Sequence, residues 1–354
     1  MTPVPRVPLA IVGAPAVGHV DEHGYVWVAD GARVEWWILG DDGWHAPRAS
    51  PSRRQRSVDN SPIVETSIRV PGGDVAWRVG AAFTDGGATI VAECENRGSI
   101  PVAVGVARVE GDAVVALDVH PVTHSSTWRG LIGSRTTDPL PDLETVSRGW
   151  LTLARRGAQI VTNDPTIDDA LTAARVALLV HHGDLVARGK RGDRDVAAAV
   201  ANALTLLDYE DEAGTLRLAA RLKPARKGLP VVGESDVVPL SVGGDHLALL
   251  ADPLLAARTA IAIRQFLVHD GGATVDCLPA YTPAWRGRSV DVSGLPTNAG
   301  TLAYAVRWHG DRPALLWEMD PPATLTARAV DANWRTDEAQ GEALLTLADV
   351  ASAP

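Results

Sequence analysis

The feature that most constrains this chain is a change in the spacing of its apolar residues, from period two to period 3.6 and back again. From about Leu9 to Trp150, short runs rich in Val, Ile and Trp are separated by clusters of Gly, Asp and Pro. Side chains alternate from Ile63 to Val70, as they do in a half-buried strand. Several short strands with regular turns predict an antiparallel β-sandwich over residues 1–160.

The period becomes helical after Val161. One predicted helix carries its apolar residues on a single face, at Ile167, Leu171, Ala174, Leu178 and Leu185. Thr166 and Asp169, just after Pro165, resemble a capping box at its start. Similar stripes predict about five helices in all. Residues 161–272 are therefore predicted to form a helical domain.

Strand patterns return from Thr274 onward. Thr301–Trp308 and Ala314–Glu318 flank Gly310-Asp311-Arg312, which predicts a hairpin turn. Residues 273–354 are expected to form a small β domain. The whole chain is thus predicted to be an α+β multidomain protein.

Composition narrows the function classes. The chain has 354 residues, 46% of them hydrophobic and 21% charged, which excludes wholesale disorder. A formal charge of −10 gives a nucleic-acid partner no general electrostatic help. No apolar run reaches the roughly 20 residues of a membrane helix, and the N-terminal run is broken by Pro8, Gly13 and Pro15. We therefore expect a cytoplasmic protein that binds neither nucleic acid nor membrane.

Cofactor and metal signatures are absent from the sequence. Cys94 and Cys277 lie far apart, in apolar contexts that predict buried free thiols, and no cysteine spacing typical of a metal site exists. The sequence has no phosphate-binding glycine loop, no Gly-x-Ser-x-Gly elbow and no His-Glu-x-x-His. We expect neither a cofactor nor a metal.

Tryptophans crowd the front of the chain, at Trp27, Trp36, Trp37 and Trp44. Trp36 and Trp37 are neighbours on one predicted strand, so their side chains point to opposite faces. If one of them fills the core, the other meets solvent, a loop or another domain. An exposed indole suits both the CH face of a sugar ring and a protein interface, and both alternatives stay open.

Acidic side chains in predicted loops are the candidates for catalysis. Glu234-Ser235-Asp236 lies in the long loop before the fourth predicted helix, and Asp195 lies at the start of the second. Two carboxylates about 5–10 Å apart, with different pKa values, perform general acid and general base chemistry in glycosidic cleavage. Acidic loops are equally common as solvated surface.

The order of these segments resembles the six-hairpin glycosidases, the glucoamylase-like and glycogen-debranching-like enzymes. The likeness rests on short stretches spread over most of the chain: Ser147–Trp150 through Asp164-Pro165, Arg194–Ala197, Asp208–Ala213, Glu234–Asp236 and Tyr304–Glu318. It implies a β-sandwich, then an α/α toroid, then a small β domain. With about five helices, the toroid would be a shortened, partial one.

The resemblance implies a glycoside hydrolase-like protein that acts on or binds a glucan or glucoside. Glu234 would be the catalytic acid, with Asp236 beside it in the catalytic site. Substrate would be bound by Arg194, Asp195, Trp36, Trp37 and Trp44. The alternative is a non-catalytic member that binds a carbohydrate or another protein, and a third possibility is a scaffold without a small ligand. Expected partners are thus a carbohydrate or small glycoside, with a protein partner as the alternative.

Overall fold

The computed structural model describes residues 6–132, 139–222, 229 and 246–347 of the chain. Within them the protein is a mixed α+β structure, rich in antiparallel sheet and with six α-helices. The α+β class predicted from the sequence is confirmed at this level. The chain divides into two compact units of separate stretches: unit 1 is Met1–Leu153, Leu179–Ala187 and His246–Pro253, and unit 2 is Ala154–Leu178, Arg188–Asp245 and Leu254–Pro354. The division at residues 160 and 272 stays a prediction.

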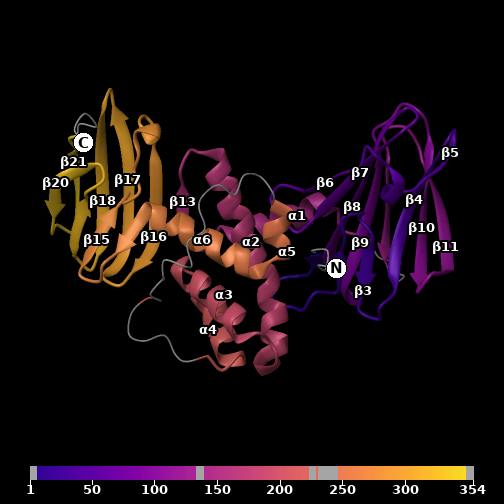
Figure 1. The fold of residues 1–354 in the computed structure, drawn as a ribbon, viewed down its shortest axis with the longest axis horizontal. Coiled ribbons are helices and arrows are strands. Elements are labelled where there is room, and N and C mark those ends of the chain that lie inside the picture. The colour runs from indigo at the N-terminus through magenta and orange to yellow at the C-terminus, as the bar shows by residue number, and fades with distance from the viewer. Residues whose placement is uncertain (1–5, 133–138, 223–228, 230–245, 348–354) are drawn as a thin grey trace. The chain divides into compact units, whose positions relative to one another are not determined.

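Unit 1 contains two antiparallel sheets, which carry the indigo and purple colours of Figure 1. Sheet A has the order β1 (Val7–Leu9), β2 (Gly18–Val20), β3 (Val26–Val28), β4 (Arg33–Gly40), β10 (Val102–Glu110) and β11 (Ala113–Val122), and β5 (Gly43–His45) also pairs with β4. Sheet B has the order β12 (Thr127–Ile132), β9 (Gly87–Asn96), β8 (Gly73–Thr84), β7 (Val64–Val70) and β6 (Arg54–Ser57). Strand β11 is thus an edge strand of sheet A.

Aromatic rings stack between the two sheets. Trp36 of β4 lies 5.5 Å from Trp77 of β8, centroid to centroid, with an interplanar angle of 11°. Trp77 stacks in turn on Trp128 of β12 at 6.2 Å, and Trp128 stacks on His120 of β11 at 4.7 Å. Trp36 and Trp77 are buried. Since the stack joins strands of both sheets, the inner faces of sheets A and B share one core.

Helix α1 (Leu143–Ala154) lies inside the region that the sequence predicted as β structure. Its apolar stripe of Leu143, Trp150 and Ala154 is buried, and the Asp142 side chain accepts a hydrogen bond from the Thr145 amide at its start. The helix packs on the outer face of sheet B, in a cluster of Ile63, Ala82, Val91 and Leu143. The helical spacing was present in the sequence, but neighbouring strand signals masked it.

The other helices follow the sequence closely: α2 (Pro165–Arg188), α3 (Arg194–Leu206), α4 (Glu210–Ala219), α5 (His246–Ala251) and α6 (Pro253–Leu267). Every residue of α2 from Ala173 to Val180 is buried, including Arg175, so this stretch is covered on all sides and not only on the single apolar face that the sequence predicted. Its start differs slightly from the expectation. Asp164 accepts a hydrogen bond from the Thr166 amide at 3.0 Å, so Asp164 is the cap and Pro165 is the first helical residue.

Unit 2 contains two further sheets, whose strands from β14 onward are orange and yellow in Figure 1. Sheet C has the order β13 (Gln159–Val161), β16 (Val290–Thr297), β17 (Gly300–His309), β18 (Arg312–Asp320) and β21 (Gln340–Leu344). Sheet D has the order β14 (Val268–Asp270), β15 (Thr274–Cys277), β19 (Thr324–Ala327) and β20 (Asp331–Thr336), with β15 and β19 parallel. The hairpin predicted around Gly310 is confirmed as the β17–β18 turn.

Both cysteines are buried and free, which confirms that part of the sequence analysis. Burial raises the pKa of the Cys94 thiol to about 12 and raises that of Cys277 as well. Neither thiol is therefore a reactive thiolate at neutral pH.

Candidate ligand-binding surfaces

The two neighbouring tryptophans of β4 point to opposite faces of sheet A, as predicted. Trp36 is 0% exposed within the core, and its indole Nε1 donates to the His23 carbonyl at 3.3 Å. Trp37 is partly exposed on the outer face, directly opposite Gly105 of β10. Because Trp36 presents no surface to a ligand, the substrate-binding role expected for it is not carried further.

Trp44 lies on the same outer face and is 51% exposed. It is paired with Leu39 across β5 and β4, and its indole extends over Gly105. A Cβ atom built on Gly105 would lie 3.0 Å and 3.1 Å from Cζ3 and Cη2 of Trp44, and 3.6 Å from Leu117 Cδ1. The glycine therefore lets the indole lie close to the sheet, with Trp37 beside it. We call Trp37, Trp44, Leu39 and Gly105 the aromatic platform.

Charged side chains lie farther along the same outer face. Arg33 forms an ion pair with Glu35, which is buried to 6% exposure, and Arg33 lies 5.2 Å from the ring of Trp27. Tyr25 is buried beside them, and burial first and Glu35 second raise the pKa of its hydroxyl to about 12. On β4, Glu35 is thus two residues from Trp37 and Arg33 is four residues from it, on the same face of the strand.

The edge strand β11 borders the aromatic platform and is unusually apolar on its exposed sides. Its half-exposed aliphatic residues are Val114, Val115, Leu117 and Val119, with exposed fractions of 47–55%. Soluble proteins usually protect an edge strand with charge, proline or a covering segment. Here the strand carries Asp118 and Pro121, and the aliphatic side chains remain open.

The outer face of sheet B is charged instead. One row runs across its five strands, through Arg56, Glu65, Arg78, Glu93 and Arg129. The side chain of Glu65 is 4% exposed and accepts hydrogen bonds from arginines on three sides. Burial alone would raise its pKa, but the hydrogen bonds from Arg97, Arg78 and Arg56 outweigh burial and lower it to about 2.

The residues of the resemblance separate in the structure. Arg194 and Asp195 are exposed in the first turn of α3, and the Arg194 guanidinium donates to the Arg221 carbonyl at 3.0 Å. The Asp193 side chain caps the same helix. Glu234 and Asp236 lie outside the described residues, so their expected catalytic roles stay predictions. The described structure thus brings Trp37 and Trp44 together, and places Arg194 and Asp195 in the other unit.

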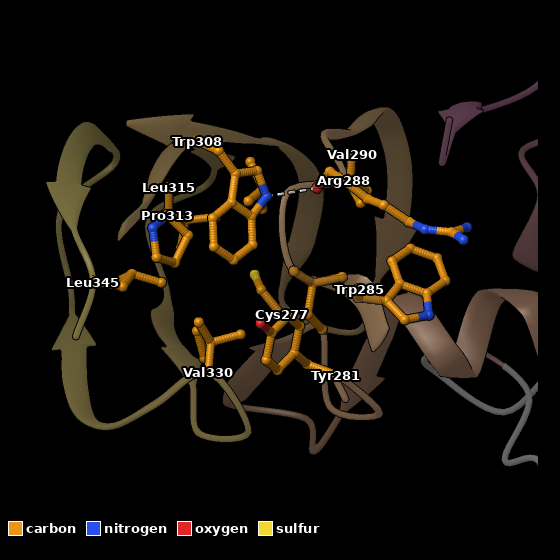
Figure 2. A pocket seen from close by; sticks show the side chains of 13 residues that line it. Cys277, Tyr281, Trp285, Arg288, Val290, Trp308, Pro313, Leu315, Val330 and Leu345 are labelled. Carbon is orange, nitrogen blue, oxygen red and sulfur yellow. Dashed lines mark hydrogen bonds between the residues drawn. The ribbon is translucent and has the colours of Figure 1, made fainter. Parts of the chain in front are cut away.

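A small apolar cavity lies between sheets C and D of unit 2 (Figure 2). Trp308, Cys277, Val330 and Leu345 surround it, and the Trp308 indole donates to the Arg288 carbonyl at 2.7 Å. The cavity measures about 10 Å³. That is roughly the room of one water molecule, and the lining offers a water few polar partners. The cavity is therefore a packing defect of the core and not a substrate site.

A much larger hollow crosses the outer face of sheet C. It has a volume of about 700 Å³ and spans β16, β17, β18 and β21. Its floor carries the small residues Ala303 and Ala305 on β17. Polar or acidic side chains on the other strands also line it: Asp291, Ser293, Glu318, Gln340 and Glu342. We call this hollow the acidic groove; its acidic residues lie on separate strands, so no local pattern in the sequence singled it out.

The comparisons with known proteins found no relative of this chain that would support a function. No protein-family model, no curated protein and no solved structure matches the chain. In the part of the chain that is described, no group of three or more His, Cys, Asp or Glu side chains is arranged to hold a metal ion. None of the described helices combines the length and apolar character that a membrane crossing requires.

Proposed function

We propose that this protein binds a carbohydrate of the glucan or glucoside class through the aromatic platform of sheet A. The observation that carries the proposal is the position of Trp44, whose indole lies over Gly105 and is about half exposed beside Trp37. An indole fixed against a sheet is a rigid, flat surface, so little conformational entropy is lost when a ligand covers it.

The chemistry of a pyranose ring fits such a surface. One face of the ring carries axial C–H groups, which contact the electron-rich face of an indole favourably. The ring hydroxyls need hydrogen-bonding groups at the edge of the platform. The Arg33–Glu35 pair lies on the same face of β4 as Trp37, and guanidinium and carboxylate groups bond hydroxyls as donors and acceptors.

Within this proposal the protein is a glycosidase-like member of the six-hairpin superfamily, with a β-sandwich in unit 1 and a partial toroid among its helices. Hydrolysis would require Glu234 as the proton donor and Asp236 beside it. Measuring release of nitrophenol from aryl glucosides tests this part. Turnover that the Glu234→Gln variant retains would remove Glu234 from the mechanism, whereas an inactive wild type that still binds sugar supports the non-catalytic alternative.

A second candidate function is recognition of another protein by the same face. The observation that favours it is the apolar edge strand β11, because open aliphatic residues next to an exposed tryptophan are typical of protein interfaces. The sugar proposal predicts that the protein binds oligosaccharides when no other protein is present. The protein-binding candidate predicts no response to them.

The experiment is a titration of the full-length chain with glucose oligomers of increasing length. Binding is measured by tryptophan fluorescence and by calorimetry. Trp44→Ala should weaken sugar binding at least tenfold, a loss of about 1.4 kcal/mol. The matched control is Phe83→Ala, since Phe83 is an aromatic residue of the same unit with 72% exposure away from the platform. Saturable binding that both variants retain equally would exclude the platform as the sugar site, and no response to any oligomer would exclude the proposal.

A further inference from the structure

Strand β11 differs from the other edge strands of the described structure in its length and its side chains. It has ten residues, whereas the strands at the other ends of the four sheets have three to six. Several of those short edges carry a proline or a charge, such as Pro8 in β1, Arg129 in β12 and Glu342 in β21. On β11 every residue from Ala113 to Val119 is exposed. Because an open edge pairs readily with a further strand, β11 is well suited to accept one.

A register shift limits which part of β11 can accept a further strand. The pairing of β11 with β10 is regular over Ala116–Val122 and shifts just before Ala116, where β10 passes from Arg108 to Val109. Irregularities of this kind bend and twist a strand locally. The regular part of the edge is therefore Ala116–Val122, and its middle residue is Val119.

The side chains of this regular part are complementary to a second copy of themselves. Two antiparallel copies, related by a two-fold axis through Val119, place Asp118 of each copy opposite His120 of the other. Asp118 is exposed, and no described residue pairs with its carboxylate. His120 is partly exposed, and its ring stacks on Trp128 at 4.7 Å. An imidazole N–H donates to a carboxylate oxygen, so the axis through Val119 forms this hydrogen-bonded pair twice.

Other positions of the axis fit less well. An axis through Asp118 would place two carboxylates directly opposite each other, and like charges there destabilise a sheet. An axis through Leu117 would leave Asp118 opposite Ala116 and extend the pairing into the register shift. With the axis at Val119, the outer face brings together only apolar side chains, since Leu117 lies opposite Pro121 and Val119 lies opposite itself. The length of the regular edge and the charges on it thus indicate the same axis.

We propose that two copies of this chain pair through β11, antiparallel and about a two-fold axis at Val119, so that their two sheets A form one continuous sheet. The pairing removes water from Leu117 and Val119, which are 52% and 47% exposed. It uses the same edge on both copies and is complete with two of them. Pro121 lies near the end of the paired stretch, so its missing N–H does not interrupt the middle.

The pairing also joins two aromatic platforms, and this step rests on the sugar function proposed above. Gly105, over which the Trp44 indole extends, lies directly opposite Val119 on the outer face. The Gly105 residues of the two copies are therefore three strand spacings apart, which is about 14 Å. A glucan that spans this distance contacts both platforms. Because its second contact is intramolecular, the dimer binds long oligomers more tightly than short ones.

The first test measures the oligomeric state of the full-length chain by sedimentation velocity over a range of concentrations. We expect a dimer. Val119→Lys places two cations opposite each other and should raise the dissociation constant of the dimer at least tenfold. The matched control is Val114→Lys, since Val114 is 55% exposed on the same strand but lies outside the regular part, and it should change the constant less than threefold. A monomeric wild type, or equal effects of the two variants, overturns the proposal.

Cysteine cross-linking tests the register, and circular dichroism verifies that each variant is folded. In the proposed dimer position 119 lies opposite itself, with Cβ atoms about 4.5–5.5 Å apart, so a small backbone shift permits a disulfide. Val119→Cys should therefore form a covalent dimer on mild oxidation, and Leu117→Cys should not. The native Cys94 and Cys277 are buried and do not compete. Linkage through Leu117→Cys but not through Val119→Cys contradicts the axis at Val119.

Oligosaccharide titrations separate the pairing from the sugar function. Asp118→Lys removes the carboxylate on the face opposite the platform, so it should weaken the dimer at least tenfold and retain the affinity for short glucose oligomers. Wild type should gain affinity with oligomer length, and Asp118→Lys should lose that gain. A dimer that binds no oligomer would remove the sugar function but not the pairing. An equal gain in both proteins would show that the two platforms do not act together.

Discussion

The outer faces of sheets A and B belong to one compact unit, yet they are built from opposite kinds of side chain. Sheet B presents a row of arginines and glutamates that neutralise one another, and helix α1 covers the apolar part of that face. Sheet A presents indoles and aliphatic residues, with Trp44 and the edge strand β11 about half exposed. Hence the charged groups on the outer face of sheet B pair with one another, whereas the outer face of sheet A exposes apolar side chains to water.

This difference bears on the proposal that sheet A carries the binding surface. A face of alternating charges gains nothing further from a partner, since each group already has its hydrogen bonds. Exposed apolar side chains that gather in one place mark a recognition surface in soluble proteins. The comparison therefore supports the proposal that a ligand is bound by the outer face of sheet A and not by that of sheet B.

The largest expected effect separates the two sides of β4. Trp36→Ala should lower the free energy of unfolding by about 3–5 kcal/mol, because it removes a buried indole from the stack on Trp77. Trp44→Ala should change it by no more than about 0.5 kcal/mol, as expected of an exposed position. Urea denaturation measures both. Similar losses in the two variants would mean that the platform is part of the core.

Charge removal on sheet B should come next. Glu65→Gln leaves Arg56, Arg78 and Arg97 around an uncharged group, and we expect a loss of about 3 kcal/mol in the free energy of unfolding. The control is Glu110→Gln, which breaks the exposed pair with Arg108 and should cost less than about 1 kcal/mol. If both variants lose the same free energy of unfolding, the buried ion pairs of Glu65 stabilise the protein no more than an exposed pair does.

The same glutamate predicts an acid dependence with a defined sign. The pKa of Glu65 is about 2 in the folded protein against an ordinary value of 4.5. A lowered pKa stabilises the fold above about pH 4.5, and this contribution is lost as the pH falls toward 2. Wild type should therefore lose more stability than Glu65→Gln between pH 5 and pH 3, as followed by urea midpoints. Parallel curves for the two proteins would contradict the assignment.

The smallest expected effect concerns the contact between the Trp44 indole and Gly105. Gly105→Ala places a methyl group 3.0–3.1 Å from the indole, so the ring must shift by a few tenths of an ångström. We expect sugar affinity to fall about threefold, or about 0.65 kcal/mol, with a nearly unchanged unfolding midpoint. An affinity equal to that of wild type would show that the position of the indole on Gly105 is not important.

The sequence predicted helices α2 to α6 well, missed helix α1, and did not predict which strands are neighbours. Asp252 before Pro253 is a typical start of a helix, and α6 begins there; apolar stripes are present in α2 and α3. These signals are local, so one stretch of sequence contains them. The pairing of β4 with β10 joins Trp37 to Gly105, and no local pattern specifies a partner so distant in the chain.

The candidate sites show the same limit. That Trp36 and Trp37 face opposite ways follows from the period of a strand, whereas the exposure of Trp44 depends on a glycine two strands away. The stretch from Arg48 to Arg56 is rich in arginine and has little apolar content, which is typical of an exposed loop. Its last residues instead form β6, where Arg56 pairs with Glu65, because the charge on the partner strand stabilises a strand with little apolar content.

Helix α2 contributes residues to both compact units, and this affects how fragments of the protein can be designed. Its residues up to Leu178 belong to unit 2 and its next stretch, Leu179–Ala187, belongs to unit 1. In unit 1, Gly183 allows the Ala14 carbonyl to approach, and His181 donates to the Leu250 carbonyl at 2.9 Å. A fragment that stops at residue 153 would lack these anchors and expose the surface they cover. Neither half can be cloned as one uninterrupted piece of the gene, so binding has to be dissected by substitution and not by truncation.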